Sequence, residues 1–224
     1  MNRAGRADTT VATHITLMGR AMLVVDVQND FIEGGSVPIP GGQEVARPLS
    51  ELACAMAEGG WTVYASRDWH PPKTHHFHDW GGKWTPHCVQ GTWGARFPPD
   101  LVLPEGTVIV SKGMDPRSEG YSVFEGVDPL GEPFARSLED RRVRQLLMGG
   151  LATDHCVRET AMDARMRGLR VELVVDAIRA VDPSEGERAL RELETAGVKL
   201  VTTEEALREI REATKTPREE AAHP

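Results

Sequence analysis

The hydrophobic residues of this chain gather in short runs that are apolar at consecutive positions rather than at every second one. Such runs are typical of strands that are buried on both faces of a sheet, whereas a half-exposed strand alternates apolar and polar residues. The pattern predicts six strands, at residues 21–27, 61–65, 107–111, 143–148, 170–175 and 198–202.

Between several of these runs the apolar residues recur with helical spacing, and a glycine follows near the end of most of these segments. The predicted helices occupy residues 43–58, 154–167, 183–196 and 204–213. Strands that alternate with helices of this length favour a parallel sheet covered on both faces. We therefore expect an α/β fold, a doubly wound and mostly parallel sheet of about six strands in a single domain.

We place that domain at residues 20–214, between a flexible N-terminal tail at 1–19 and a polar tail at 215–224. A chain of 224 residues can bury a large apolar core without help from disulfides, and its three cysteines are too few and too scattered for a disulfide framework. The N-terminal segment lacks the continuous apolar stretch of a secretory signal. A cytoplasmic protein with reduced thiols is expected.

The charge of the chain narrows the range of partners. A formal net charge of −8, with no cluster of Lys and Arg, disfavours nucleic acid and anionic membrane surfaces. The apolar runs are also far shorter than the roughly 20 residues that span a bilayer. A small-molecule substrate is the expected partner, and the sequence is compatible with a homo-oligomer.

One stretch, residues 68–106, has no sustained periodicity, yet it holds five of the eight histidines and four of the five tryptophans. Loops of this length are usually functional or disordered, and an aromatic-rich composition argues against disorder. Asp68 and His70 come directly after a predicted strand, and His87 follows after a segment long enough to fold back. One carboxylate and two imidazoles suit one divalent ion, zinc, or iron or manganese if water fills further positions. The alternative is a histidine-rich surface loop.

Cys156 lies where the run Gly-Gly-Leu-Ala-Thr-Asp-His-Cys passes from a predicted strand into a predicted helix that Thr153 or Asp154 would cap. The first turn of a helix offers unpaired N–H groups and the positive end of the dipole, which lower the pKa of a thiol. Cys156 is therefore a candidate nucleophile. Its alternative is a small buried hydrophobic residue, the role we expect of Cys54 and Cys88.

Asp26 ends the first predicted strand and Lys112 follows the third. The carboxyl ends of parallel strands meet at one edge of the sheet, where open α/β sheets bind their ligands. A carboxylate, an ammonium group and a thiol at that edge would supply a base, a charge stabiliser and a nucleophile. Taken singly, Asp26 could instead cap a turn and Lys112 could be solvated.

Five strings along the chain then carry a resemblance to a known family. They are Val-Val-Asp-Val-Gln-Asn-Asp-Phe at 24–31, Asp-Trp-His-Pro at 68–71, Trp-Thr-Pro-His-Cys-Val at 84–89, Val-Ser-Lys-Gly at 110–113 and Ala-Thr-Asp-His-Cys-Val at 152–157. In this order they resemble the nicotinamidases, members of the isochorismatase-like cysteine hydrolases, and the resemblance covers roughly residues 20–202. It implies the same doubly wound fold and hydrolysis of nicotinamide, and of pyrazinamide, to the acid and ammonia.

The resemblance also implies roles for particular residues. The positions matching the catalytic triad are Asp26, Lys112 and Cys156. Those matching the metal ligands are Asp68, His70 and His87, with His76 as an additional contact for which His75 competes. Those matching the walls of the substrate pocket are Phe31, Trp84 and Tyr121. The backbone N–H groups of Ala152 and Cys156 match the oxyanion hole, and the Leu151–Ala152 peptide bond is expected to be cis.

Three other functions compete with this interpretation. Another small-amide or carbamoyl hydrolase of the same superfamily would share the triad. A metallohydrolase would attack with metal-bound water and use Cys156 only structurally. A zinc-stabilised binding domain would turn nothing over. Loss of all turnover in a Cys156→Ala variant that keeps its metal would exclude the second and the third.

Overall fold

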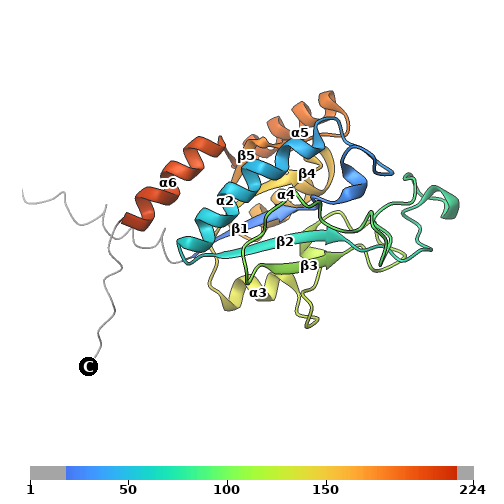
Figure 1. The fold of residues 1–224 in the computed structure, drawn as a ribbon, viewed down its shortest axis with the longest axis horizontal. Coiled ribbons are helices and arrows are strands. Elements are labelled where there is room, and N and C mark those ends of the chain that lie inside the picture. Colours follow the sequence, from blue (N-terminus) through green and yellow to red (C-terminus); the bar gives the residue numbers. More distant parts are fainter. Residues whose placement is uncertain (1–18, 216–224) are drawn as a thin grey trace, which may run out of the picture.

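The computed structural model of the protein describes residues 19–215, which form one six-stranded sheet with helices on both faces (Figure 1). The strands are β1 Arg20–Val25, β2 Thr62–Asp68, β3 Val108–Lys112, β4 Gln145–Leu151, β5 Arg170–Arg179 and β6 Lys199–Val201. All neighbouring strands pair in parallel, in the order β3-β2-β1-β4-β5-β6. The predicted fold class is confirmed, and every residue of the central strands β1 and β4 is buried, as their continuous apolar sequences require.

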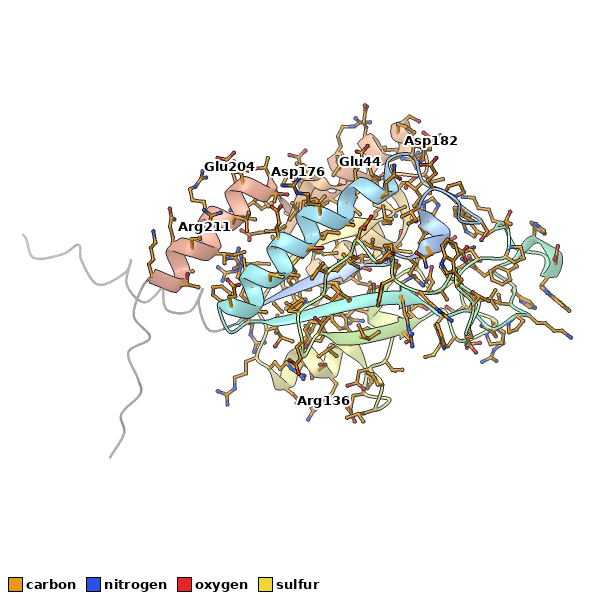
Figure 2. All side chains as sticks on the ribbon, in the orientation of Figure 1. Glu44, Arg136, Asp176, Asp182, Glu204 and Arg211 are labelled. Carbon is orange, nitrogen blue, oxygen red and sulfur yellow. The ribbon has the colours of Figure 1, made fainter. Side chains whose placement is uncertain are left out.

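The helices divide between the two faces of the sheet. They are α2 Ala46–Glu58, α3 Phe134–Asp140, α4 Arg158–Met166, α5 Pro183–Thr195 and α6 Thr203–Lys215. The apolar sides of α2 and α6 pack into one hydrophobic core, and those of α3, α4 and α5 into the other. In Figure 1 α2 and α6 run side by side in front of the sheet. The outer sides are charged, and Figure 2 shows Glu204 and Arg211 of α6 pointing away from the sheet.

Two predicted features of the helices are wrong in detail. The segment predicted as one helix at 154–167 is a π-helical turn, η5 Thr153–Val157, followed by α4. The helix α3, in the connection from β3 to β4, was not predicted. Seven residues are too few to establish a helical period, and α3 is anchored by only two large apolar side chains, Phe134 and Leu138.

Much of the long connection from β2 to β3 lies beyond the carboxyl ends of the strands, and its last part runs back past α2 to the start of β3 (Figure 1). As predicted, it is mostly irregular, with one short helical turn, η3 His78–Trp80. Polar residues that follow β1 hold this connection against the sheet by hydrogen bonds. Asn29 donates its side-chain amide to the backbone oxygen of Trp93 at 2.9 Å, and the buried Asp30 accepts the backbone N–H of Cys88 at 2.7 Å. From β1 the next strands, β2 and β3, are added on one side, whereas β4, β5 and β6 are added on the other side. The topological switch point, where such sheets bind ligands, therefore lies at the carboxyl ends of β1 and β4.

Three further short turns, η1 Asn29–Phe31, η2 Gly42–Val45 and η4 Val123–Glu125, complete the described elements. Within the described residues no helix is long and apolar enough to cross a membrane. The tails predicted at 1–19 and 215–224 fall, except for Gly19 and Lys215, outside the described residues. All three cysteines are free thiols, and Cys88 belongs to the core as expected.

Candidate active site

Asp26 follows β1 directly, where a positive φ of 47° turns the chain away from the sheet. Its side chain is fully buried. Ser66 of β2 holds it by two contacts, because the Ser66 hydroxyl donates to Oδ1 at 2.7 Å and accepts the backbone N–H of Asp26 at 3.3 Å. The second carboxylate oxygen, Oδ2, lies 2.9 Å from Nζ of Lys112.

Lys112 ends β3 and is also fully buried. Besides Asp26, its Nζ atom donates to Oδ1 of Asp68 at 2.5 Å, to the backbone oxygen of Gly120 at 2.9 Å and to Sγ of Cys156 at 3.3 Å. The ammonium group therefore lies between two carboxylates and the thiol. A buried lysine is tolerated only with such partners, since an unpaired buried charge costs several kcal/mol.

Cys156 lies in η5, directly after β4, and is buried. The thiol and the carboxylates of Asp26 and Asp68 each offer an atom within 4.8 Å of the others. The bond between Leu151 and Ala152 is cis, as expected. The predicted cap is wrong: the turn has no side-chain cap, because the Asp154 carboxylate instead accepts the backbone N–H of Val181 at 2.9 Å.

The electrostatics of this cluster correct one expectation. We expected the helix start to lower the pKa of the Cys156 thiol, but burial raises it well above its usual value, and Lys112 offsets only part of that effect. Burial also raises the pKa of Asp26, against the attraction of Lys112. Burial by itself would lower the pKa of Lys112, yet Asp26 and Asp68 raise it well above normal. The site thus combines a neutral thiol, a carboxyl group of raised pKa and an ammonium group of raised pKa.

Three imidazoles lie beside this cluster. His70, His76 and His87 are buried, and each offers one nitrogen within 4.8 Å of the others. Burial lowers the pKa of His87 and lowers that of His76 to about 3, with His70 adding to the effect on His76. Neutral imidazoles are the form that binds metal ions. His75 and His78 are exposed and lie outside this group, so the structure places His76 rather than His75 with the other two.

Asp68 connects the two clusters. Its Oδ1 holds Lys112, while Oδ2 lies 3.7 Å from Nε2 of His70. Burial would raise its pKa, but Lys112 and His70 outweigh that effect and hold it far below its usual value. Nε2 of His70 is buried without a hydrogen-bond partner. An orphaned imidazole nitrogen among two further imidazoles and an ionised carboxylate fits a divalent ion of the zinc class.

A small pocket, partly open to solvent, lies between the two clusters. The predicted wall residues Phe31, Trp84 and Tyr121 line it together with Cys156 and Ala152. The indole of Trp84 donates to the hydroxyl of Tyr121 at 2.9 Å, which fixes one wall. Four further lining residues were not predicted from the sequence, namely Val37, Ile39, His155 and Val181.

Two supporting residues were also missed. Ser66 binds Asp26, and Gln28 binds Asp68: its side-chain carbonyl accepts the Asp68 backbone N–H at 2.7 Å, and its amide donates to the Asp68 carbonyl at 2.8 Å. Both are buried polar residues that directly follow an apolar residue, Ala65 before Ser66 and Val27 before Gln28. That contrast was the available signal, because a buried polar group needs a partner.

Comparison with known proteins agrees with this geometry. The model of the family described as the isochorismatase domain matches residues 20–205. Over 185 residues the chain is 42% identical to the nicotinamidase/pyrazinamidase of Mycobacterium tuberculosis, covering 81% of this chain and 98% of that protein. The pyrazinamidase of Pyrococcus horikoshii in complex with zinc superposes with a TM-score of 0.76 at 41% identity, over 82% of this chain and 98% of that one. PnC1 of L. infantum in complex with nicotinate gives a TM-score of 0.76 at 32% identity, over 84% and 94%.

Proposed function

The chain belongs to the isochorismatase-domain family, and from that premise we propose that it is a metal-dependent cysteine amidohydrolase that converts nicotinamide to nicotinate and ammonia. One observation carries the proposal. A buried thiol, a buried ammonium group and a buried carboxylate meet beside a pocket with aromatic walls, which the thiol lines, and two of the three clustered imidazoles line the same pocket. Pyrazinamide differs from nicotinamide by one ring nitrogen, and we propose it as a second substrate of the same site.

Formation of the acyl-enzyme begins at Asp26. Its carboxylate takes the proton of the Cys156 thiol while Sγ attacks the carboxamide carbon. The raised pKa of Asp26 suits this step, since burial makes the carboxylate a stronger base than in water. Lys112 stabilises the thiolate as it forms. The backbone N–H groups of Ala152 and Cys156 hold the oxyanion, a contribution of about 3 kcal/mol per donor in a comparable site.

The tetrahedral adduct then collapses to a thioester. Asp26 returns its proton to the leaving nitrogen, and ammonia departs. Asp26 next removes a proton from water, whose oxygen attacks the thioester carbon. When the C–S bond breaks, Asp26 returns that proton to Sγ, which restores the thiol, and the product loses its carboxyl proton to solvent and leaves as nicotinate. One carboxylate therefore acts as base and then as acid in each half of the reaction, while Lys112 keeps its charge throughout.

Four residues are proposed to hold a single zinc ion. They are Asp68, His70, His76 and His87. The ion would supply a coordination position for the pyridine nitrogen and so orient the ring. Phe31 and Trp84 pack against the ring faces, and Tyr121 completes the wall through its hydrogen bond with Trp84.

The test is ammonia release by purified protein from a panel of small amides. Nicotinamide and pyrazinamide should be turned over, whereas ureido acids and simple aliphatic amides should react far more slowly, because they lack a ring nitrogen. Cys156→Ala should lose all activity and keep its metal content. A faster reaction with a ureido substrate would assign another amidase of the family, and an active Cys156→Ala variant would favour a metallohydrolase.

A further inference from the structure

The three imidazoles are oriented through their Nδ1 atoms. Nδ1 of His70 lies 2.9 Å from the backbone oxygen of Gly113, and Nδ1 of His87 lies 2.7 Å from that of Thr85. A carbonyl oxygen can only accept, so Nδ1 carries the proton in both rings. In the neutral form of each ring the lone pair is then on Nε2, and Nε2 of His70 is buried without a hydrogen-bond partner.

His76 differs from the other two. Its Nδ1 lies 3.0 Å from a carboxylate oxygen of Glu119, so its orienting partner is a charged side chain rather than a backbone carbonyl. The His76 side chain is 3% exposed, whereas the Glu119 side chain is 56% exposed to solvent. Glu119 lies in the segment after β3 that also carries Gly120, the backbone partner of Lys112.

The Glu119 carboxylate also changes the net charge around the three imidazoles. A divalent ion brings two positive charges, and Asp68 already shares its negative charge with Lys112. Glu119 supplies another negative charge, transmitted through the imidazole of His76. A carboxylate that accepts from a metal-binding histidine fixes its tautomer and makes its free nitrogen a stronger ligand.

We propose that Glu119 is a positioning residue that makes His76 a metal ligand and thereby sets the affinity of the site for zinc. The inference rests on the proposed metal site and concerns Glu119 alone. Glu119 acts on the metal site through His76, and its interaction with the Tyr121 side chain in the pocket wall is a separate contact. Its removal should therefore weaken metal binding, while the enzyme saturated with metal keeps most of its kcat.

The experiment measures the dissociation constant of Zn²⁺ alone by competition with a chromophoric chelator. Glu119→Ala should bind Zn²⁺ about 10- to 100-fold more weakly than wild type. Glu119→Gln keeps an acceptor for Nδ1 without the charge and should lie between the two. Glu125→Gln is the matched control, because Glu125 is an exposed carboxylate nearby whose partner is the Ser118 hydroxyl at 2.6 Å. Circular dichroism of each metal-free variant checks the fold.

A double-mutant cycle then tests whether Glu119 affects zinc affinity through His76. In a His76→Ala background, Glu119→Ala should change the zinc affinity by less than about twofold. A full effect in that background, or wild-type affinity in Glu119→Ala, would overturn the inference and leave the metal site itself intact. Failure of the wild-type protein to bind Zn²⁺ would overturn the metal site and this inference together. Zinc binding that is lost in His70→Ala but unchanged in both His76→Ala and Glu119→Ala would show that the site uses three protein ligands.

Discussion

Ser66 orients the base of the proposed reaction, and its replacement by alanine tests that role. The Ser66 hydroxyl makes a 2.7 Å hydrogen bond to Oδ1 of Asp26 and accepts the Asp26 backbone N–H. Both residues are fully buried, so water cannot substitute for the lost partner without opening the core. A hydrogen bond to a charged group contributes about 1.5–3 kcal/mol.

The sign of the pH effect follows from the causes of the shift. Burial raises the pKa of Asp26, and the Ser66 bond is one of the contacts that lower it, because it favours the charged form. Ser66→Ala should therefore raise the pKa of Asp26 further. Since the reaction starts from the carboxylate, the acid limb of the kcat/KM profile should move to higher pH. At pH 7 kcat/KM should fall about 10- to 100-fold, each 1.36 kcal/mol corresponding to a factor of ten.

The assay is ammonia release from nicotinamide across the pH range in which the variant stays folded. Ser50→Ala is the control. The Ser50 hydroxyl on α2 also both donates, to Ala46, and accepts, from Val102, but it is remote from the sheet edge. An unchanged acid limb in Ser66→Ala, or one moved to lower pH, would refute the assignment of Asp26 as the base.

Three further outcomes are expected. Gln28→Ala removes the hydrogen bonds to the backbone of Asp68 and one of 3.0 Å to the backbone oxygen of Ala95. The variant should lose about 3 kcal/mol of unfolding free energy in urea titrations, and elemental analysis should find less zinc. Burial alone would raise the pKa of Glu172, but Arg20 and Lys199 outweigh it and lower that pKa. Glu172→Gln should therefore cost about 3 kcal/mol at pH 7 and progressively less as the pH falls below the unfolded value of 4.5, in urea unfolding at each pH. Removal of metal by a chelator should abolish activity and lower Tm, and Zn²⁺ should restore both where Mg²⁺ does not, because imidazole ligands suit zinc.

The placement of the main site residues followed from strand direction. Asp26 and Lys112 come at the carboxyl ends of continuous apolar runs, and parallel strands bring such ends to one edge. Their meeting in space was therefore predictable before any contact was known. The positions of Asp68, His70 and His87 also indicated a metal site. The resemblance added His76, because a segment without periodicity does not show which of its remaining histidines converges with them.

The features that were missed depend on tertiary contacts. Ser66 and Gln28 lie next to apolar runs, and nothing local shows that their partners come from residues 40 positions away. The pKa of Cys156 was predicted in the wrong direction because the dipole of a helix start is a local effect, whereas burial depends on the whole fold. Asp154 likewise gives its carboxylate to the segment before α5 instead of capping its own turn.

The most direct test of the central claim is mass spectrometry of the wild-type protein quenched during turnover of nicotinamide. The account predicts an adduct with the mass of a nicotinoyl group, located on Cys156 by peptide mapping and absent from Cys156→Ser. An adduct on Cys54 or Cys88, or steady turnover by Cys156→Ala without any acyl-enzyme, would contradict the thioester mechanism.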